Sequence, residues 1–270
     1  MGPYELNSTI TYKRVINAGL WTIRLKPDDL SLINFLPGQY AELGLFLPVE
    51  QCSTSSDKPA EVKSSGFVRR QYSIVSSPRD KEGIEFYLVL VPEGRLTPRL
   101  YELAEGDRLW IGPKMKGKFT MEEIPARKHL VMISTGTGIA PFISMLRHYR
   151  GQNRWEKLVL IHAARVSGDL GYREELTSVS REDKSVVYIP TVTREPQGST
   201  WAGHRGRVQT LLEDSVYEKL VGDSLSADKC QVFMCGNPDM IEVVSSSLES
   251  KGFSKHSRKM PGNIHFERYW

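Results

Sequence analysis

The hydrophobic pattern of this 270-residue chain changes near residue 126, and this change constrains the fold more than any other feature. Before it, short runs of strand-forming residues are separated by Pro and Gly: STITYKRVI, LWTIRLKP, GQYAELGLF, QYSIVSS, IEFYLVLVP and DRLWIG. After it, four apolar runs each precede an amphipathic segment: HLVMIST before APFISMLRHYR, KLVLIHAA before YREELTSV, SVVYIPTVT before GRVQTLLED, and CQVFMCG before PDMIEVVSSSLESKG. The first pattern predicts an antiparallel six-stranded β-barrel. The second predicts a parallel sheet with crossover helices. We therefore expect a β domain over residues 1–123 and an α/β domain over residues 124–270.

The composition excludes several classes of protein. With 40% hydrophobic and 25% charged residues the chain is neither disordered nor fibrous. A formal charge of +4 is too mild to indicate nucleic acid. No apolar run approaches the roughly 18 residues of a membrane span, and no secretion signal is evident at the start. Three cysteines are too few for a closed disulfide set, and six scattered histidines give no metal-ligand spacing. We expect a cytoplasmic monomer without a metal, with a flexible polar loop over residues 49–66.

The stretch STGTGIAP, residues 134–141, follows the first strand of the predicted parallel sheet and opens its first helix. Glycines allow the backbone to approach a phosphate, and the amides of a helix start attract an anion. The same sequence also fits a merely tight turn, because Pro141 stands where the third glycine of the dinucleotide fingerprint belongs. Its position at a strand end favours a pyrophosphate site.

Three arginines follow the next strand ends of the same sheet. The second strand runs into Arg165, the third into Arg194, and Arg207 follows closely. A carboxylate after the second strand is typical of NAD enzymes, whereas arginine suits a 2′-phosphate. Any one arginine is more often a solvated surface residue. The group of three favours NADP over NAD.

The first half offers an aromatic ring and a second phosphate-binding segment. In RRQYSIVSSP, residues 69–78, strand alternation places Arg70, Tyr72 and Ile74 on one face. A cation–π pair on a half-exposed sheet would explain Arg70 and Tyr72 equally well. The segment PEGRLTPRL adds a turn and a helix start, with Thr97 as the expected N-cap and Pro98 at the first helical position.

Two features close the second half. FMCGNPDM ends a parallel strand with Cys235, a residue type that usually fills a core but that here could also lie near a bound nicotinamide. The chain then finishes in HFERYW, and an aromatic end is best explained if it docks on something flat.

These segments together resemble the ferredoxin (flavodoxin)–NADP reductases, most closely the bacterial type with an aromatic C-terminal extension. The shared segments are RQYS, PEGRLTPRL, GTGIAP, HAAR, TVTRE, CGNPDM and ERYW, which occur in the family order and span nearly the whole chain. The resemblance implies an FAD-binding barrel followed by an NADP-binding α/β domain. The loop at 49–66 looks longer than the family commonly carries.

The resemblance also implies roles for individual residues. Around FAD, Arg70 pairs with the pyrophosphate, Tyr72 stacks on the flavin and Tyr269 covers its other face. The full FAD set is Arg70, Gln71, Tyr72, Ser73, Leu88, Val89, Leu90, Arg95, Leu96, Thr97, Thr137, Tyr269 and Trp270. The NADP set is Thr137, Gly138, Arg165, Arg194, Arg207, Gly236, Asn237 and Asp239. Ser73, Cys235 and Glu267 surround the hydride path as catalytic residues.

The implied activity is electron transfer between NADPH, which gives two electrons at once, and ferredoxin or flavodoxin, which takes one at a time. Because the chain has too few cysteines for its own cluster, the acceptor is expected to be a separate acidic protein. Arg69 and the KMKGK run at 114–118 could attract it or be an ordinary solvated face. An NADPH-dependent flavin or ferric reductase and a non-turnover FAD sensor are the two alternative functions.

Overall fold

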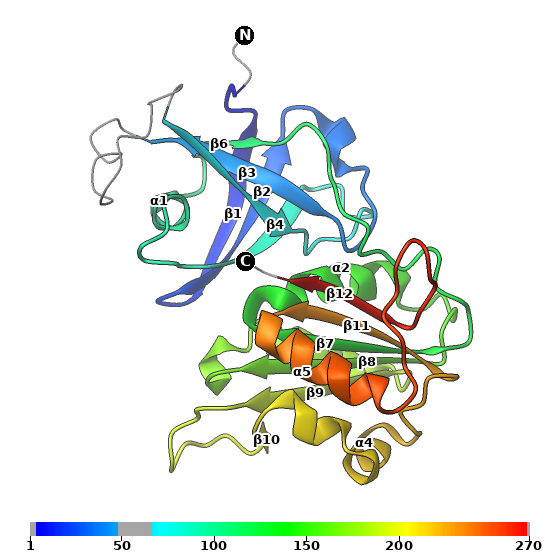
Figure 1. Cartoon of the computed structure of the whole chain (residues 1–270). Coiled ribbons are helices and arrows are strands. Elements are labelled where there is room, and N and C mark those ends of the chain that lie inside the picture. The colour runs from blue at the N-terminus through cyan, green and yellow to red at the C-terminus, as the bar shows by residue number, and fades with distance from the viewer. Residues whose placement is uncertain (1–3, 48–65, 269–270) are drawn as a thin grey trace, which may run out of the picture. The chain divides into compact units, whose positions relative to one another are not determined.

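The computed structural model describes residues 4–47 and 66–268. The chain divides into two compact units, Met1–Lys118 and Phe119–Trp270 (Figure 1). The expected boundary at 123 and 124 falls inside the second unit. Phe119 and Ile124 are buried, and the Phe119 ring packs within 6 Å of the rings of Phe142 and Phe233 in the second unit.

The first unit contains six antiparallel strands in the order β4-β3-β6-β1-β2-β5. Their bounds are β1 (Ser8–Asn17), β2 (Leu20–Pro27), β3 (Tyr40–Phe46), β4 (Phe67–Ser73), β5 (Ile84–Val89) and β6 (Arg108–Ile111). A bridge between Ile74 and Phe86 links the two outer strands. The Val75 amide adds a 2.8 Å bond to the Glu85 carbonyl, so the sheet closes on itself as the sequence predicts.

Period-two alternation fills the interior of this unit. Trp21, Ile23 and Leu25 of β2 are fully buried, and they lie beside Ile84, Phe86 and Leu88 of β5. Two short helices complete the unit, η1 (Leu30–Ile33) and α1 (Thr97–Glu102). Because the core is built from inward-facing strand residues, the outward-facing and edge positions remain available for a ligand.

Two local predictions in this unit need correction. Strand β4 begins at Phe67, four residues before the predicted run QYSIVSS, because Phe67 pairs with Phe46 and stacks on Tyr4 at 4.1 Å. The predicted N-cap, Thr97, is the first residue of α1, and Leu96 occupies the cap position without a side-chain bond. Pro98 is therefore the second helical residue.

The second unit is a six-stranded sheet in the order β10-β9-β8-β7-β11-β12, with every strand pair parallel. The strands are β7 (His129–Thr135), β8 (Lys157–Ala164), β9 (Val186–Val192), β10 (His204–Arg205), β11 (Cys230–Gly236) and β12 (Ile264–Arg268). The helices are α2 (Ala140–Tyr149), α3 (Arg173–Glu182), α4 (Asp214–Val221) and α5 (Pro238–Glu249), with 3-10 turns η3 (Gly136–Ile139), η4 (Ser167–Asp169) and η5 (Val208–Leu212).

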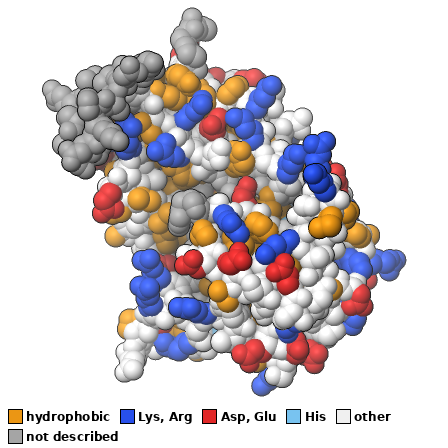
Figure 2. Space-filling model, viewed as in Figure 1, with side chains coloured by type: hydrophobic (Ala, Val, Ile, Leu, Met, Phe, Trp, Pro, Cys, Tyr) orange, Lys and Arg blue, Asp and Glu red, His pale blue; other side chains and the backbone are white. Residues whose placement is uncertain are grey.

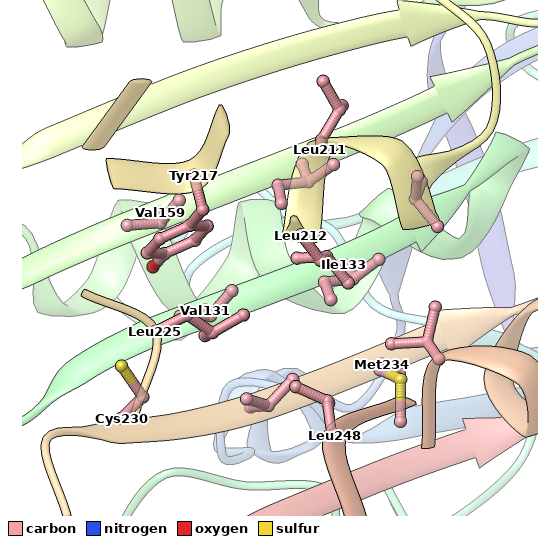
Figure 3. Close-up of a cluster of buried hydrophobic side chains, with 14 of the residues drawn as sticks. Val131, Ile133, Val159, Leu211, Leu212, Tyr217, Leu225, Cys230, Met234 and Leu248 are labelled. Carbon is pink, nitrogen blue, oxygen red and sulfur yellow. The ribbon is translucent and has the colours of Figure 1, made fainter. Parts of the chain in front are cut away.

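Helices cover both faces of this sheet. On one face η5, α4 and α5 bury a cluster that includes Val131, Val159, Tyr217 and Leu248 (Figure 3). On the other face α2 lies beside α3, and Arg147 joins them through two bonds of 2.7 and 2.8 Å to the Glu175 carboxylate. Because both faces are covered, a ligand can reach this sheet only at its edges or strand ends.

The sequence patterns did not predict two strands and one interruption of a helix. The tail segment Ile264–Arg268 is strand β12, which pairs with β11. The two-residue strand β10 is too short for any pattern to predict. The expected helix over GRVQTLLED is instead the 3-10 turn η5 followed by α4, with Glu213 extended between them.

Candidate functional site

The carboxyl ends of the parallel strands bring most of the predicted nucleotide-binding residues to one edge. Strand β7 ends at Thr135, and the turn η3 connects it directly to α2, as the sequence predicts. Gly136 has a φ of 54°, a left-handed conformation in which side chains are strained. This glycine therefore lets the chain turn sharply between strand and helix.

Close packing against β11 fixes the rest of the turn. A Cβ atom on Gly138 would lie 2.3 Å from the Cys235 carbonyl oxygen, and one on Gly236 would lie 2.2 Å from Thr135 Oγ1. The Asn237 amide donates a 2.8 Å bond to the same Thr135 hydroxyl. The turn and the end of β11 therefore approach each other as closely as two backbones can.

Asn237 and Asp239 lie at the start of α5, beside this turn. The Asn237 side chain is the N-cap and accepts bonds from the amides of Asp239 and Met240. Both Asn237 and Asp239 are exposed. The sequence-predicted helix start at Asn-Pro is thus confirmed, while a nucleotide-binding role for these two residues stays a prediction.

The three predicted arginines lie at the ends of adjacent strands. Arg165 follows β8, Arg194 lies just beyond β9, and the Arg194 amide donates a 2.7 Å bond to the Arg165 carbonyl. Arg207 follows β10, whose neighbour Gly206 donates to the Val192 carbonyl. Lys and Arg side chains gather at the left edge of this unit in Figure 2, where the strands end in Figure 1.

All three arginine side chains are exposed. Within residues 4–47 and 66–268 none of the three guanidinium groups forms an ion pair or a side-chain hydrogen bond. The neighbouring Arg205 differs, because its guanidinium bonds the Glu195 carbonyl at 3.2 Å and the Ser199 hydroxyl at 3.1 Å. Three uncommitted cations at one edge are suited to bind an anionic group.

Cys235 and Glu267 are register partners on β11 and β12. Neighbouring residues in a parallel ladder point to the same face, so their side chains lie on one side of the sheet. Cys235 is fully buried, and Glu267 is half-buried with Oε2 enclosed and without a hydrogen-bond partner among the described residues. The structure thus brings together two of the three predicted catalytic residues.

Burial raises the pKa of Glu267 to about 7. Desolvation disfavours the charged carboxylate, and burial is the only cause of this shift. Near neutral pH this carboxyl can therefore be present in both its protonated and its ionised form. Its location at the carboxyl edge makes it a candidate proton carrier.

In the antiparallel unit, Arg70, Gln71, Tyr72 and Ser73 form the end of β4. Arg70 and Gln71 are exposed, Tyr72 is half-buried against the core and Ser73 is buried. Burial raises the pKa of the Tyr72 phenol to about 12, so the ring is neutral at any ordinary pH. In the described residues it is Arg69, on the opposite face, that stands over the rings of Tyr4 and Trp110.

The turn after β5 is held by Thr97. Its hydroxyl accepts a 3.0 Å bond from the Val91 amide and donates a 3.2 Å bond to the Val91 carbonyl. Leu96 is a core residue and Arg95 is exposed. The sequence predicts that Thr97 caps α1, but its hydroxyl instead holds the turn over residues 91–97.

Among Leu88, Val89 and Leu90, the backbone of Val89 is the one turned away from β2. The Leu90 amide bonds the Gly19 carbonyl on the β2 side, whereas the Glu85 carbonyl accepts from Val75 on the other. Since bond direction alternates along a strand, Val89 faces the same side as Glu85. Near the end of β5, the amide and carbonyl of Val89 are therefore placed to form hydrogen bonds with the polar edge of a planar ligand.

Comparisons with known proteins show which family the chain resembles. Residues 132–246 match the oxidoreductase NAD-binding domain. A flavodoxin/ferredoxin–NADP reductase of Buchnera aphidicola subsp. Schizaphis graminum is 35% identical over 95% of this chain and 97% of that protein. One from Escherichia coli strain K12 is 34% identical over 88% of this chain and 89% of that protein.

The chain belongs to the flavodoxin/ferredoxin–NADP reductase family. Its fold agrees with that of a ferredoxin NADP+ reductase from Neisseria gonorrhoeae, solved with bound FAD and NADP, at a TM-score of 0.84 and 24% identity over 99% of both chains. The family resemblance and the two-part fold class predicted from the sequence are both confirmed.

Two predicted residues of the reductase site, Tyr269 and Trp270, lie outside the described residues, as does the polar stretch 49–66 apart from Gly66. Strand β12 carries the chain to Arg268, the register partner of Gly236. No helix among the described residues is long and apolar enough to cross a membrane. Sequence reasoning also passed over the buried His162 in the HAAR segment, because a histidine within an apolar strand gives no distinctive signal.

Proposed function

We propose that this reductase transfers electrons between NADP(H) and ferredoxin or flavodoxin through an FAD bound by the antiparallel unit. The observation that carries the proposal is the group of three uncommitted arginines at the ends of β8, β9 and β10. These are the three strands that follow in order on one side of β7, which leads into the glycine-tight turn. A 2′-phosphate distinguishes NADP from NAD, and guanidinium groups bind it bidentately.

On the NADP side, Arg165, Arg194 and Arg207 hold the 2′-phosphate. Thr137 and Gly138 bring the backbone of η3 to the nucleotide, and Gly236, Asn237 and Asp239 border it from β11 and α5. Gly138 and Gly236 support this assignment, because a side chain at Gly138 would collide with the Cys235 backbone and one at Gly236 would collide with the Thr135 hydroxyl. The edge is thus cationic, and the two segments meet closely where both carry glycine.

On the FAD side, Tyr72 offers an aromatic face, and Arg70 and Arg95 offer exposed positive charge. Gln71, Ser73 and the edge of β5 from Leu88 to Leu90 supply polar groups, with Val89 the best placed. Leu96 and Thr97 fix the turn for the pyrophosphate, and Thr137 is an additional FAD contact in the proposal. When bound, FAD accepts a hydride from NADPH and releases electrons one at a time.

Cys235 and Glu267, together with Ser73, serve the hydride path in this proposal. The adjacent positions of Cys235 and Glu267 support their joint action. A carboxyl with a pKa near 7 can give or take a proton at Oε2 without a large energetic cost. Tyr269 and Trp270 follow directly on β12, and we assign them to the flavin and the adenine of FAD.

Exposed positive charge in the antiparallel unit supports an acidic protein as the acceptor. Lys114 and Lys118 are exposed and without ion pairs to other described residues. Arg69 and Lys116 instead share the Glu42 carboxylate, at 3.6 and 3.0 Å. Electrostatic attraction of an acidic partner therefore depends on Lys114 and Lys118 rather than on all of the basic residues. The proposal further places the reductase in the cytoplasm, since its cysteine usage suits a reducing compartment. It also takes the protein to be a monomer.

A comparison of acceptors tests this function. The purified flavoprotein is given NADPH and, in separate assays, a ferredoxin, a flavodoxin, free flavin and a ferric chelate. We expect kcat/KM for the ferredoxin or flavodoxin to exceed that for the small acceptors by at least about tenfold. Equal or better turnover of the small acceptors would favour a flavin or ferric reductase instead.

A further inference from the structure

His162 on β8 is a buried polar residue that the proposed function does not use. Its side chain is fully buried in the interior of the parallel unit, on the face of the sheet opposite the Tyr217 cluster. Nε2 lies 3.1 Å from the Gly136 carbonyl oxygen, and Nδ1 lies 3.3 Å from the Tyr188 hydroxyl. Both ring nitrogens are therefore engaged, one of them by the first residue of η3.

These contacts define the tautomer of the ring. A carbonyl oxygen can only accept, so Nε2 must carry the proton that it donates to Gly136. Burial lowers the pKa of His162 to about 4, so the ring is neutral and Nδ1 accepts from the Tyr188 hydroxyl. Tyr188 thereby favours the tautomer that Gly136 requires.

The bond to Gly136 fixes one peptide plane of the turn. In a planar trans peptide the carbonyl and the following amide point in opposite directions. Since the Gly136 carbonyl points to His162, the Thr137 amide points away from His162. Reversal of this peptide plane needs rotation about ψ of Gly136 and φ of Thr137. Glycine has no side chain to restrict its part of that rotation, so the bond to His162 helps to hold the plane. Reversal would direct a carbonyl oxygen where the amide had been and would repel an anion.

We propose that His162, oriented by Tyr188, is a positioning residue that holds the Thr137 amide ready for the pyrophosphate of NADP. The inference rests on the proposed nucleotide site and adds a role for two residues in the interior of the sheet. Thr135 and Gly138 anchor the turn from the β11 side, and His162 anchors it from the β8 side.

Nucleotide binding by two variants tests the inference. His162→Leu keeps a similar volume and removes the donor, whereas His162→Gln keeps an N–H that can reach the carbonyl. Calorimetry with the FAD-loaded protein should show NADP+ bound about tenfold more weakly by His162→Leu and within about threefold of wild type by His162→Gln. Adenosine 2′-monophosphate, which has no pyrophosphate, should bind both variants as it binds wild type.

Tyr188→Phe supplies a gentler test that keeps the ring. Its matched control is Tyr217→Phe in the same unit, because the buried Tyr217 hydroxyl has no hydrogen-bond partner among the described residues (Figure 3). Tyr188→Phe should weaken NADP+ about two- to fivefold, and the control should not. Histidine ¹⁵N NMR of the wild type should show His162 protonated at Nε2.

Three outcomes would overturn the inference. They are wild-type NADP+ affinity in a folded His162→Leu protein, equal loss in His162→Leu and His162→Gln, and an Nδ1-protonated ring in the wild type. If His162→Leu does not fold, the wild-type tautomer and Tyr188→Phe still decide. Failure of the wild type to bind NADP+ would instead contradict the proposed function itself.

Discussion

At the residue scale, the proposed function depends on side chains that have no partner among the described residues. Arg165, Arg194 and Arg207 are exposed and uncommitted, while nearby Arg205 is used to hold a loop. Glu267 shows the opposite situation, a carboxyl enclosed without a compensating bond. The unpaired arginines add no stabilising ion pair, and the enclosed carboxyl lowers the stability of the fold. Both are typical of binding and catalytic groups.

The arginines predict cofactor choice. In Arg165→Ala and Arg194→Ala, loss of one charged hydrogen bond should cost about 1.5 to 3 kcal/mol, which lowers kcat/KM for NADPH roughly ten- to a hundredfold. NADH should be little affected because it has no 2′-phosphate. Arg181→Ala, which removes an exposed charge from α3, is the control. Steady-state kinetics with both nucleotides check this, and equal losses for NADPH and NADH would refute the assignment.

Glu267 predicts a pH dependence of stability. Its folded pKa, about 7, lies above the ordinary value of 4.5, so the folded state binds more protons than the unfolded state between these values. Relative to Glu267→Gln, wild-type stability should therefore be greatest below pH 4.5 and decline as the pH rises through 7. Denaturant unfolding at several pH values checks the difference between the two proteins. Parallel stability curves would mean that Glu267 is not desolvated in the native state.

At the element scale, the contact between η3 and β11 is the tightest part of the nucleotide edge. It depends on Gly138, at which a side chain would overlap the Cys235 backbone, and on Gly236, at which one would overlap the Thr135 hydroxyl. A glycine-rich turn before a helix can present main-chain amides to a phosphate. The geometry of the turn therefore comes from the neighbouring strand as much as from its own sequence.

Gly138→Ala tests this packing. The added Cβ would lie 2.3 Å from the Cys235 carbonyl oxygen and must displace backbone. We expect about 1 to 3 kcal/mol lower unfolding free energy and weaker NADP+ binding. Gly168→Ala is the control, since that position has open space and no positive φ. Denaturant melts and calorimetry decide, and a Gly138→Ala protein as stable as Gly168→Ala would contradict the contact.

Sequence patterns predicted the elements that follow one local rule and missed those that depend on distant partners. The alternation after residue 126 predicted β7 to β9 and β11, because buried parallel strands read as apolar runs. Strand β12 escaped notice because its five residues pair with β11, which is distant in the sequence. Thr97 looked like an N-cap, yet its hydroxyl bonds Val91 across a turn that no pattern describes.

The same distinction applies to the site. Arg165, Arg194 and Thr137 could be assigned to the nucleotide edge because the ends of parallel strands meet there. The raised pKa of Glu267 and the tautomer of His162 could not be predicted, because both depend on burial and on contacts across strands. The arginine assignments stay predictions until the kinetics are measured.

At the scale of the whole molecule, two units share the chemistry of one reductase. The antiparallel unit offers an aromatic face and cationic groups, and the parallel unit offers a nucleotide edge. The division suits an enzyme that exchanges two electrons with a nucleotide and one with a protein. Surface charge then governs how quickly the protein partner arrives.

Ionic strength tests this last point. At saturating NADPH, the KM for an acidic ferredoxin or flavodoxin should rise with salt, because exposed charges are screened beyond roughly 10 Å at 0.1 M. Lys114→Ala with Lys118→Ala should flatten this dependence, whereas Arg181→Ala with Lys184→Ala in the other unit should not. A KM for the acceptor that does not change with salt would refute electrostatic steering.

The most direct test of the account is anaerobic mixing of the purified protein with NADPH while its visible absorption is recorded. The protein should be yellow with bound FAD, lose that colour when NADPH is added, and regain it when oxidised ferredoxin or flavodoxin follows. A protein that binds no FAD, or whose flavin stays oxidised in the presence of NADPH, would contradict the central claim.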